Sequence, residues 1–147
     1  MIKYTVGNIL DATEEAIVIP VNCVGVAGAG LALQCKEKYP WWYTNYHHWC
    51  QSGKAGIGKI EYYLLMGTPK YIISFPTKKH WKNPSHICYI MCGLEELVDF
   101  VKLKKIKSIA VPWLGCGLGG LSKGEVRKLF EKYFVDSNVE YVVYSRR

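Results

Sequence analysis

The chain has 147 residues, 50% of them hydrophobic, and a formal net charge of +7 from 19 Lys and Arg against 12 Asp and Glu. This length suits one domain with a sizeable core, and no apolar run is long enough to cross a bilayer. A basic surface attracts polyanions, although the same excess of charge can serve solubility alone. We therefore expect a single domain over residues 1–147, without a membrane span, and a lean toward a nucleic-acid or polyphosphate partner.

The cysteines and the N-terminus indicate the cellular compartment in which the protein functions. Six cysteines lie mostly inside apolar segments, and no C-x-x-C pair occurs. This usage predicts buried, reduced thiols in a cytoplasmic protein. The chain enters a strand pattern within its first residues, so we expect no signal peptide. Cys88 and Cys92 share one face of a predicted helix, but neither has a ligand partner nearby in sequence, so no metal is expected.

Strand and helix patterns take turns along the chain. Strands are predicted over residues 2–6, 16–21, 60–65, 71–74, 108–111 and 140–144, and helices over 31–39, 42–50 and 123–134. The clearest helix follows Asn83 and Pro84, which are predicted as its N-cap and first residue, and its apolar positions continue to Val101. This order predicts an α/β fold with a largely parallel sheet covered by helices on both faces.

Two glycine-dense loops follow predicted buried strands. The later one reads V-P-W-L-G-C-G-L-G-G-L over 111–121, and Ser122 and Glu125 then form a capping box for the next helix. The earlier one reads G-V-A-G-A-G over 25–30 and matches neither a dinucleotide fingerprint nor a Walker loop. Glycine-rich backbone near a helix N-terminus can turn N–H groups onto an anion, whereas a purely structural turn needs fewer glycines. Two such loops fit a diphosphate held from both sides.

A third segment, F-P-T-K-K-H-W at 75–81, follows the strand predicted over 71–74. Ligands of such sheets bind beyond the carboxyl ends of the strands, where both glycine loops also fall. A lysine amine beside a bound sugar can attack an anomeric carbon in its neutral form. Lys78 and Lys79 taken alone are more often solvated surface charges, and their position after the strand is what favours a functional role.

These strings, together with V-N-C-V-G-V-A-G-A-G-L-A-L-Q-C-K-E-K-Y-P at 21–40 and G-N-I-L at 7–10, resemble a macrodomain. The resemblance covers nearly the whole chain and is strongest to the DarG antitoxin branch, which is related to the terminal ADP-ribose protein glycohydrolases. It implies a three-layer α/β/α fold with a mixed, largely parallel central sheet. It also implies ADP-ribose binding. DarG-type enzymes remove ADP-ribose from thymidine in DNA, and the related glycohydrolases release it from acidic protein side chains.

The resemblance also assigns residues. It places Asn8 and Ile9 at the adenine, Asn22 near the distal ribose, and Lys78 as the catalytic lysine, which attacks or electrostatically assists at the distal ribose. The remaining ligand-binding positions that it implies are Gly28, Ala29 and Gly30 in the first loop, Pro76 and Thr77 before the lysine, and Gly115, Cys116, Gly117, Leu118 and Gly119 in the second loop.

Other residues near the lysine carry weaker expectations. Lys79 is expected as an auxiliary charge, and His80 and Trp81 as contacts to nucleic acid or as packing residues. For Trp81 we favour packing, because tryptophans are mostly buried in folded domains. His47 and His48 lie in an aromatic helical segment, where surface packing is the better interpretation than catalysis.

Two positions depart from the family pattern. Gly119 stands where the protein glycohydrolases carry an aspartate, which favours nucleic acid over protein as the target. Ala27 replaces a methionine of the first loop. The chain ends near where a macrodomain ends, so direct binding of a toxin is not expected. We thus expect a monomeric ADP-ribosyl glycohydrolase without metal or organic cofactor, acting on thymidine-ADP-ribosylated DNA.

Two other functions stay open at this point, because the same loops serve them. One is a non-enzymatic reader that binds ADP-ribose without turnover. The other is a hydrolase with a different substrate, either an ADP-ribose 1″-phosphate phosphatase or an enzyme that removes ADP-ribose from protein esters.

Overall fold

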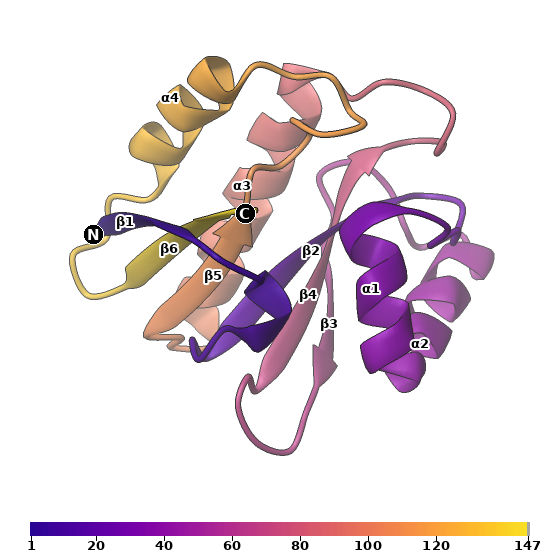
Figure 1. Ribbon diagram of the computed structural model, residues 1–147, viewed down its shortest axis with the longest axis horizontal. Coiled ribbons are helices and arrows are strands. Elements are labelled where there is room, and N and C mark those ends of the chain that lie inside the picture. The colour runs from indigo at the N-terminus through magenta and orange to yellow at the C-terminus, as the bar shows by residue number, and fades with distance from the viewer. Residues whose placement is uncertain (147) are drawn as a thin grey trace.

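The computed structural model describes residues 1–146 and shows a central sheet with helices on both sides (Figure 1). The strands are β1 (Ile2–Val6), β2 (Ala16–Asn22), β3 (Glu61–Leu64), β4 (Tyr71–Lys78), β5 (Ser108–Pro112) and β6 (Glu140–Ser145). The helices are α1 (Gly30–Lys38), α2 (Pro40–Gln51), α3 (Ile87–Leu103) and α4 (Lys123–Tyr133), and a short 3₁₀ turn, η1 (Ile9–Asp11), follows β1.

The six strands lie in the order β1-β6-β5-β2-β4-β3. All neighbours pair in parallel except β3, which runs antiparallel to β4 at one edge. This arrangement confirms the predicted mixed, largely parallel sheet of a three-layer α/β/α fold. Because the parallel strands run in one direction, their carboxyl ends meet at a single edge of the sheet.

The sheet buries a separate core on each face. In β2, Ala16 and Val18 join the core beneath α3 and α4, whereas Ile17 and Ile19 join the core beneath α1 and α2. This follows from the period of two in strand side chains, and both sides of a buried parallel strand are apolar. In the second core the indole Nε1 of Trp42 donates a hydrogen bond to Ser74 Oγ over 3.0 Å.

Two elements differ from the sequence prediction. Strand β4 continues to Lys78 instead of ending at Ser74, because residues 75–77 are buried and the strand keeps pairing with β2 as far as Asn22. Helix α3 begins at Ile87 with His86 as its N-cap, so the prediction of Asn83 as cap and Pro84 as first residue is wrong. The backbone N–H of Ser85 instead donates to the carbonyl of Gly119 over 3.0 Å, a tertiary contact that holds this stretch outside the helix.

The cysteine prediction is partly wrong. All six cysteines are free, but only Cys35 is buried, whereas Cys88 and Cys92 are exposed on α3. Both lie on the solvent side of a helix whose opposite face packs on the sheet. Within residues 1–146, no helix combines the length and the apolar character that a membrane span requires.

Candidate functional site

Three segments leave the carboxyl edge of the sheet and lie against one another. We name them the first loop (residues 23–29, after β2), the β4–α3 segment (residues 79–86) and the second loop (residues 113–122, after β5). The N–H of Cys23 donates to the carbonyl of Lys79 over 3.2 Å, and the Ser85 N–H reaches Gly119 in the second loop. Figure 1 shows these connections gathered at the upper edge of the sheet.

Asn22 holds the first loop in shape. Its side-chain Oδ1 accepts hydrogen bonds from the N–H groups of Val24, Gly25 and Val26 over 3.1, 3.1 and 3.3 Å. Its Nδ2 donates to the Val26 carbonyl over 2.8 Å, and the hydroxyl of Tyr46 donates to its Oδ1 over 2.9 Å. Asn22, which the resemblance places near the distal ribose, is therefore a buried hub whose side chain organises the loop backbone.

Side chains of α2 hold the same loop through contacts with the Gly25 carbonyl and with Asn22. The Tyr43 hydroxyl donates to the Gly25 carbonyl over 2.9 Å, and His47 Nδ1 lies 3.2 Å from that oxygen. Burial raises the pKa of the Tyr46 hydroxyl well above its ordinary value, and burial raises the pKa of the Cys50 thiol to about 11. These groups stay protonated at neutral pH. They hold the loop and do not supply a nucleophile.

The start of α1 offers unpaired backbone donors beside the first loop. Its N-cap, Ala29, makes no side-chain capping bond, and Gly30 has a φ of +58°. The first N–H to bond back is that of Leu33, which donates to the Ala29 carbonyl over 3.3 Å. The N–H groups of Gly30, Leu31 and Ala32 precede it and have no intrahelical acceptor. With the positive end of the helix dipole, they suit an anion.

Glycine contacts shape the second loop. A Cβ on Gly119 would lie 2.5 Å from the Gly115 carbonyl oxygen, and Gly115 itself has a φ of +75°. The Leu121 N–H donates to that same carbonyl over 2.9 Å. Among the described residues, no acceptor pairs with the N–H of Gly117, Leu118 or Gly119. The loop thus has free donors, and a side chain at position 119 would force its backbone to shift.

Lys78 is the last residue of β4, which lies beside β2 on the side away from β5, so the first loop stands between Lys78 and the second loop in the sheet order. Lys78 pairs with Asn22 of β2, is partly buried, and its Nζ donates to the Trp81 carbonyl over 3.4 Å. Pro76 and Thr77, which precede it, are buried in β4. The β4–α3 segment therefore folds back over the lysine amine.

Most side chains of the β4–α3 segment face solvent, and Ser85 is the buried exception. Trp81 is 49% exposed and stacks on His80 with ring centroids 5.4 Å apart, so the prediction that Trp81 packs in the protein is wrong. The amines of Lys79 and Lys82 lie 5.7 Å from the Tyr89 ring and 5.2 Å from the Trp81 ring, respectively. This surface combines exposed aromatic faces with cations next to Lys78.

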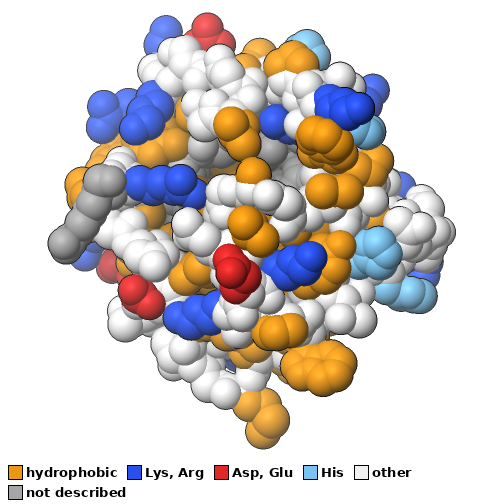
Figure 2. Space-filling model, turned by 45° about the vertical axis from the view of Figure 1, so that its right-hand side comes forward, with side chains coloured by type: hydrophobic (Ala, Val, Ile, Leu, Met, Phe, Trp, Pro, Cys, Tyr) orange, Lys and Arg blue, Asp and Glu red, His pale blue; other side chains and the backbone are white. Residues whose placement is uncertain are grey.

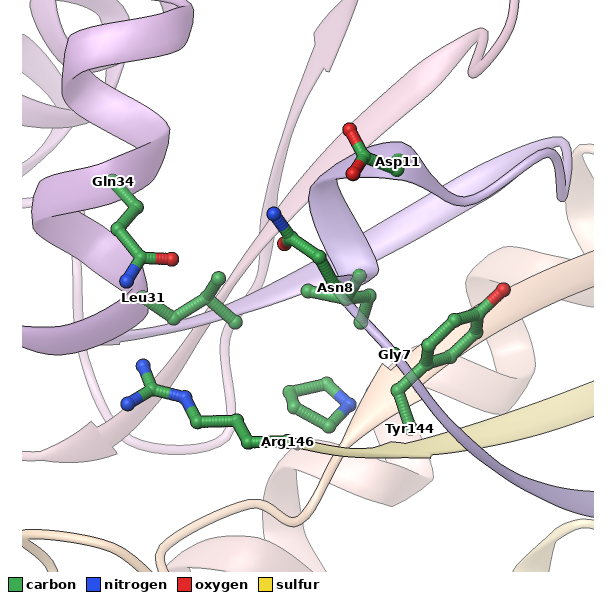
Figure 3. Close-up of a pocket in the computed structure, with 9 residues that line it drawn as sticks. Gly7, Asn8, Asp11, Leu31, Gln34, Tyr144 and Arg146 are labelled. Atoms are coloured by element: carbon green, nitrogen blue, oxygen red, sulfur yellow. The ribbon is translucent and has the colours of Figure 1, made fainter.

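A cavity of about 580 Å³ opens at the same edge, on the side of α1 (Figure 3). It brings together Asn8 and Ile9, as the resemblance implies for one subsite, whereas Lys78 and the second glycine loop lie outside its lining. The sequence analysis missed the rest of that lining, which consists of Gly7, Asp11, Leu31, Gln34, Pro112, Tyr144 and Arg146. Tyr144 ends the strand predicted over 140–144 and Arg146 lies just beyond it, so their position at the carboxyl end of a parallel strand was the signal that could have found them.

Polar groups of this cavity are fixed by their neighbours. Asn8 Oδ1 accepts from the Leu10 N–H over 3.0 Å, which caps η1. The Tyr144 hydroxyl donates to Glu14 over 2.6 Å. Arg146 Nη2 lies 3.8 Å from the point where a Cβ of Gly30 would stand, so the guanidinium reaches from the cavity toward the start of α1. The described residues include no group of three His, Cys, Asp or Glu side chains placed to bind a metal ion.

Residues 18–130 match the Macro domain family. The chain is 45% identical over 98% of its length to the DNA ADP-ribosyl glycohydrolase of Mycobacterium tuberculosis, and 42% identical over 90% to that of Thermus aquaticus. It spans only 42% and 37% of those two proteins.

Solved structures are similar in fold. The macrodomain of Mycobacterium tuberculosis DarG superposes with a TM-score of 0.95 at 44% identity, covering 98% of this chain and 97% of that one. Thermosipho africanus DarTG in complex with ADP-ribose superposes with a TM-score of 0.89 at 33% identity, covering 96% of this chain and 40% of that one.

Proposed function

This chain belongs to the macrodomain family, and on that premise we propose that it binds ADP-ribose and removes it from modified DNA. The observation that carries the proposal is the position of Lys78. It ends β4 directly beside β2 and the first loop, at the same edge as the free N–H groups of α1 and of the second loop, and an exposed aromatic and basic surface adjoins it.

The ligand would extend along the carboxyl edge of the sheet. The adenine enters the 580 Å³ cavity, where Asn8 supplies an amide and Arg146 a guanidinium. The diphosphate lies between the first N–H groups of α1 and the unpaired N–H groups of Gly117–Gly119. The distal ribose then reaches Lys78. This placement uses the free donors of α1 and of the second loop.

The lysine can act on the distal ribose in one balanced sequence. The neutral Lys78 amine attacks the anomeric carbon, and the bond to the base breaks with its electron pair leaving on the base, which takes up a proton. Water then replaces the amine on that carbon, so ADP-ribose is released and the lysine regains its starting form. The hydrogen bond from Lys78 Nζ to the Trp81 carbonyl orients the amine before the ligand arrives.

Charge and surface composition favour DNA as the target. The chain carries a net charge of +7, and on the face in Figure 2 few acidic side chains interrupt the Lys and Arg side chains. Trp81 and His80 offer stacking faces for bases, and Lys79 and Lys82 offer charges for phosphates. Gly119 stands where the resemblance implies an aspartate in the related protein glycohydrolases. The group that supports release of ADP-ribose from protein side chains there is therefore absent from this loop.

Release of ADP-ribose from a thymidine-ADP-ribosylated oligonucleotide tests the proposal. We expect Lys78→Ala to lower the rate by at least about 100-fold, the lower range for loss of a group that takes part in the chemistry. ADP-ribose affinity, measured by calorimetry, should change little. Lys104→Ala is the matched control, because Lys104 follows α3 at the opposite edge of the sheet and should leave the rate unchanged.

Two competing substrates separate the alternatives. A glutamyl-ADP-ribosylated protein and ADP-ribose 1″-phosphate are offered to the native chain under the same conditions. Faster release from either of them than from DNA would contradict the DNA proposal. No turnover of any substrate, with ADP-ribose still bound, would show a non-enzymatic reader.

A further inference from the structure

A second cavity, of about 270 Å³, lies on the other face of the sheet, beside α4; we name it the α4 cavity. Neighbouring residues at the carboxyl ends of β5 and β6 divide between the two cavities: Pro112 and Tyr144 line the first, and Ser145 and Trp113, which directly follows β5, line the second. Successive residues of a strand point to opposite faces, which explains this division. The α4 cavity therefore adjoins the same edge as the proposed ADP-ribose site without being part of it.

Its floor is a fixed pair of aromatic rings. Tyr4 and Trp113 stack with centroids 5.8 Å apart and an angle of 19° between their planes. The indole N–H of Trp113 donates to Ser145 Oγ over 2.9 Å, and its ring packs on buried Phe130 with centroids 5.6 Å apart. The floor is thus held by a hydrogen bond and by the core.

Two exposed cations cover this floor. The Arg127 guanidinium lies 4.3 Å from the centroid of the Tyr4 ring, and Lys123 Nζ lies 5.6 Å from that of the Trp113 ring. An acidic partner of Arg127 is Glu131, at 3.8 Å on the exposed side of α4. Within residues 1–146, the backbone N–H groups of Lys123 and Gly124 in the first turn of α4 have no acceptor. The cavity is therefore lined by donors and positive charge.

We propose that the α4 cavity binds a backbone phosphate of the DNA strand that carries the modified base. This inference rests on the proposed function. Two cations, free N–H groups and the Ser145 hydroxyl are ligands for a phosphodiester, and the aromatic floor suits the adjoining sugar or base. An excess of seven positive charges adds a general attraction for a polyanion.

The geometry of the edge connects the α4 cavity to Lys78. The β4–α3 segment lies on one side of the second loop, through the bond between Ser85 and Gly119, and α4 begins at Lys123, directly after that loop. Figure 1 shows the loop between these two segments. A DNA strand that presents a modified base at Lys78 and continues across the second loop would next reach Lys123 and Arg127.

Binding of an unmodified, fluorescently labelled single-stranded oligonucleotide over a range of salt concentrations tests this. The double variant Lys123→Gln with Arg127→Gln should bind more weakly. Each phosphate contact to a single strand contributes about 0.7 to the slope of log K against log salt, so loss of this one contact should lower the slope by about 0.7. Each single variant should show about half of that change.

The matched control is Lys128→Gln with Lys132→Gln, which removes two exposed charges from the same helix outside the cavity. Equal slopes for the two double variants would overturn the proposal, because the effect would then reflect net charge alone. Binding of inorganic phosphate that is lost in the cavity variant, while oligonucleotide binding stays native, would also overturn it. That result would show a site for free phosphate.

Release of ADP-ribose from a small substrate distinguishes failure of the phosphate-contact proposal from failure of the proposed function. Thymidine-ADP-ribose carries no neighbouring nucleotides, so both double variants should release ADP-ribose from it at the native rate. If the native chain releases ADP-ribose neither from this substrate nor from the modified oligonucleotide but the slope change is present, the proposed activity is wrong and the phosphate contact remains. If release is native and the slope is unchanged, the α4 cavity proposal is wrong.

Discussion

The two glycine loops are built in opposite ways although both adjoin or contain free N–H groups at the same edge of the sheet. The first loop is held by side chains, because Asn22 bonds to three of its N–H groups and α2 adds Tyr43, Tyr46 and His47. The second loop is shaped by the lack of side chains, since Gly119 packs directly on the Gly115 carbonyl. The first loop depends on hydrogen bonds from side chains, and the second loop depends on the absence of a Cβ at Gly119. Deleting a side chain should therefore damage the first loop, and adding one should damage the second.

The largest effect is expected from Asn22→Ala. The change removes the acceptor of three backbone N–H groups and of the Tyr46 hydroxyl, in a residue that is 7% exposed. An unsatisfied buried polar group costs about 1–3 kcal/mol. Because part of this loop can rehydrate, we expect the free energy of unfolding to fall by about 3 kcal/mol in all, measured by urea denaturation.

Tyr46→Phe is the smaller change with which the loss of stability in Asn22→Ala is compared. It deletes only the hydroxyl that donates to the oxygens of Asn22, and should cost about 1 kcal/mol. If Asn22→Ala costs no more than Tyr46→Phe, the first loop does not depend on the asparagine hub, and the contrast between the loops fails.

Adding a methyl group tests the second loop. In Gly119→Ala the new Cβ meets the Gly115 carbonyl, so the loop backbone must shift and its free N–H groups lose their positions. We expect a loss of about 2 kcal/mol in the free energy of unfolding, within the usual range for overpacking. The affinity for ADP-ribose should fall at least 10-fold, by about 1.4 kcal/mol.

Gly117→Ala is the matched control, because a Cβ there meets nothing within 4 Å. Its free energy of unfolding should stay close to native. Equal losses in the two variants would show that chain flexibility, and not the close contact, shapes the loop. Gly119→Asp should behave like Gly119→Ala, so the aspartate of the protein glycohydrolases is not expected to function in this loop.

The same contrast separates the features of the fold that the sequence could predict from those that it could not. Strand and helix periodicity predicted the α/β fold, and the strands that end at Asn22 and Pro112 were found within one residue. The extension of β4 to Lys78 was missed, because Pro76 argues locally against a strand while burial and pairing with β2 stabilise one. Local pattern predicts elements well where no distant partner decides them.

The site shows the same division. The glycine strings indicated where the loops lie, since glycines at turns are a local signal. The hub at Asn22 depends on Tyr46, 24 residues away, and the start of α3 depends on the bond between Ser85 and Gly119. Trp81 was predicted to pack because of its residue type, yet it lies in a segment held outside the core. Such contacts exist only once the chain has folded.

The smallest effect is expected from Ser85→Ala, beneath the second loop. Ser85 is 5% exposed, and within residues 1–146 its hydroxyl has no hydrogen-bond partner, although its backbone N–H holds Gly119. Deleting an unsatisfied buried hydroxyl relieves its desolvation penalty and leaves the backbone bond in place. The free energy of unfolding should therefore stay within about 0.5 kcal/mol of native or rise slightly. A loss above about 1 kcal/mol in urea denaturation would show that the hydroxyl makes a hydrogen bond after all. The second loop would then depend on a side chain, as the first loop does.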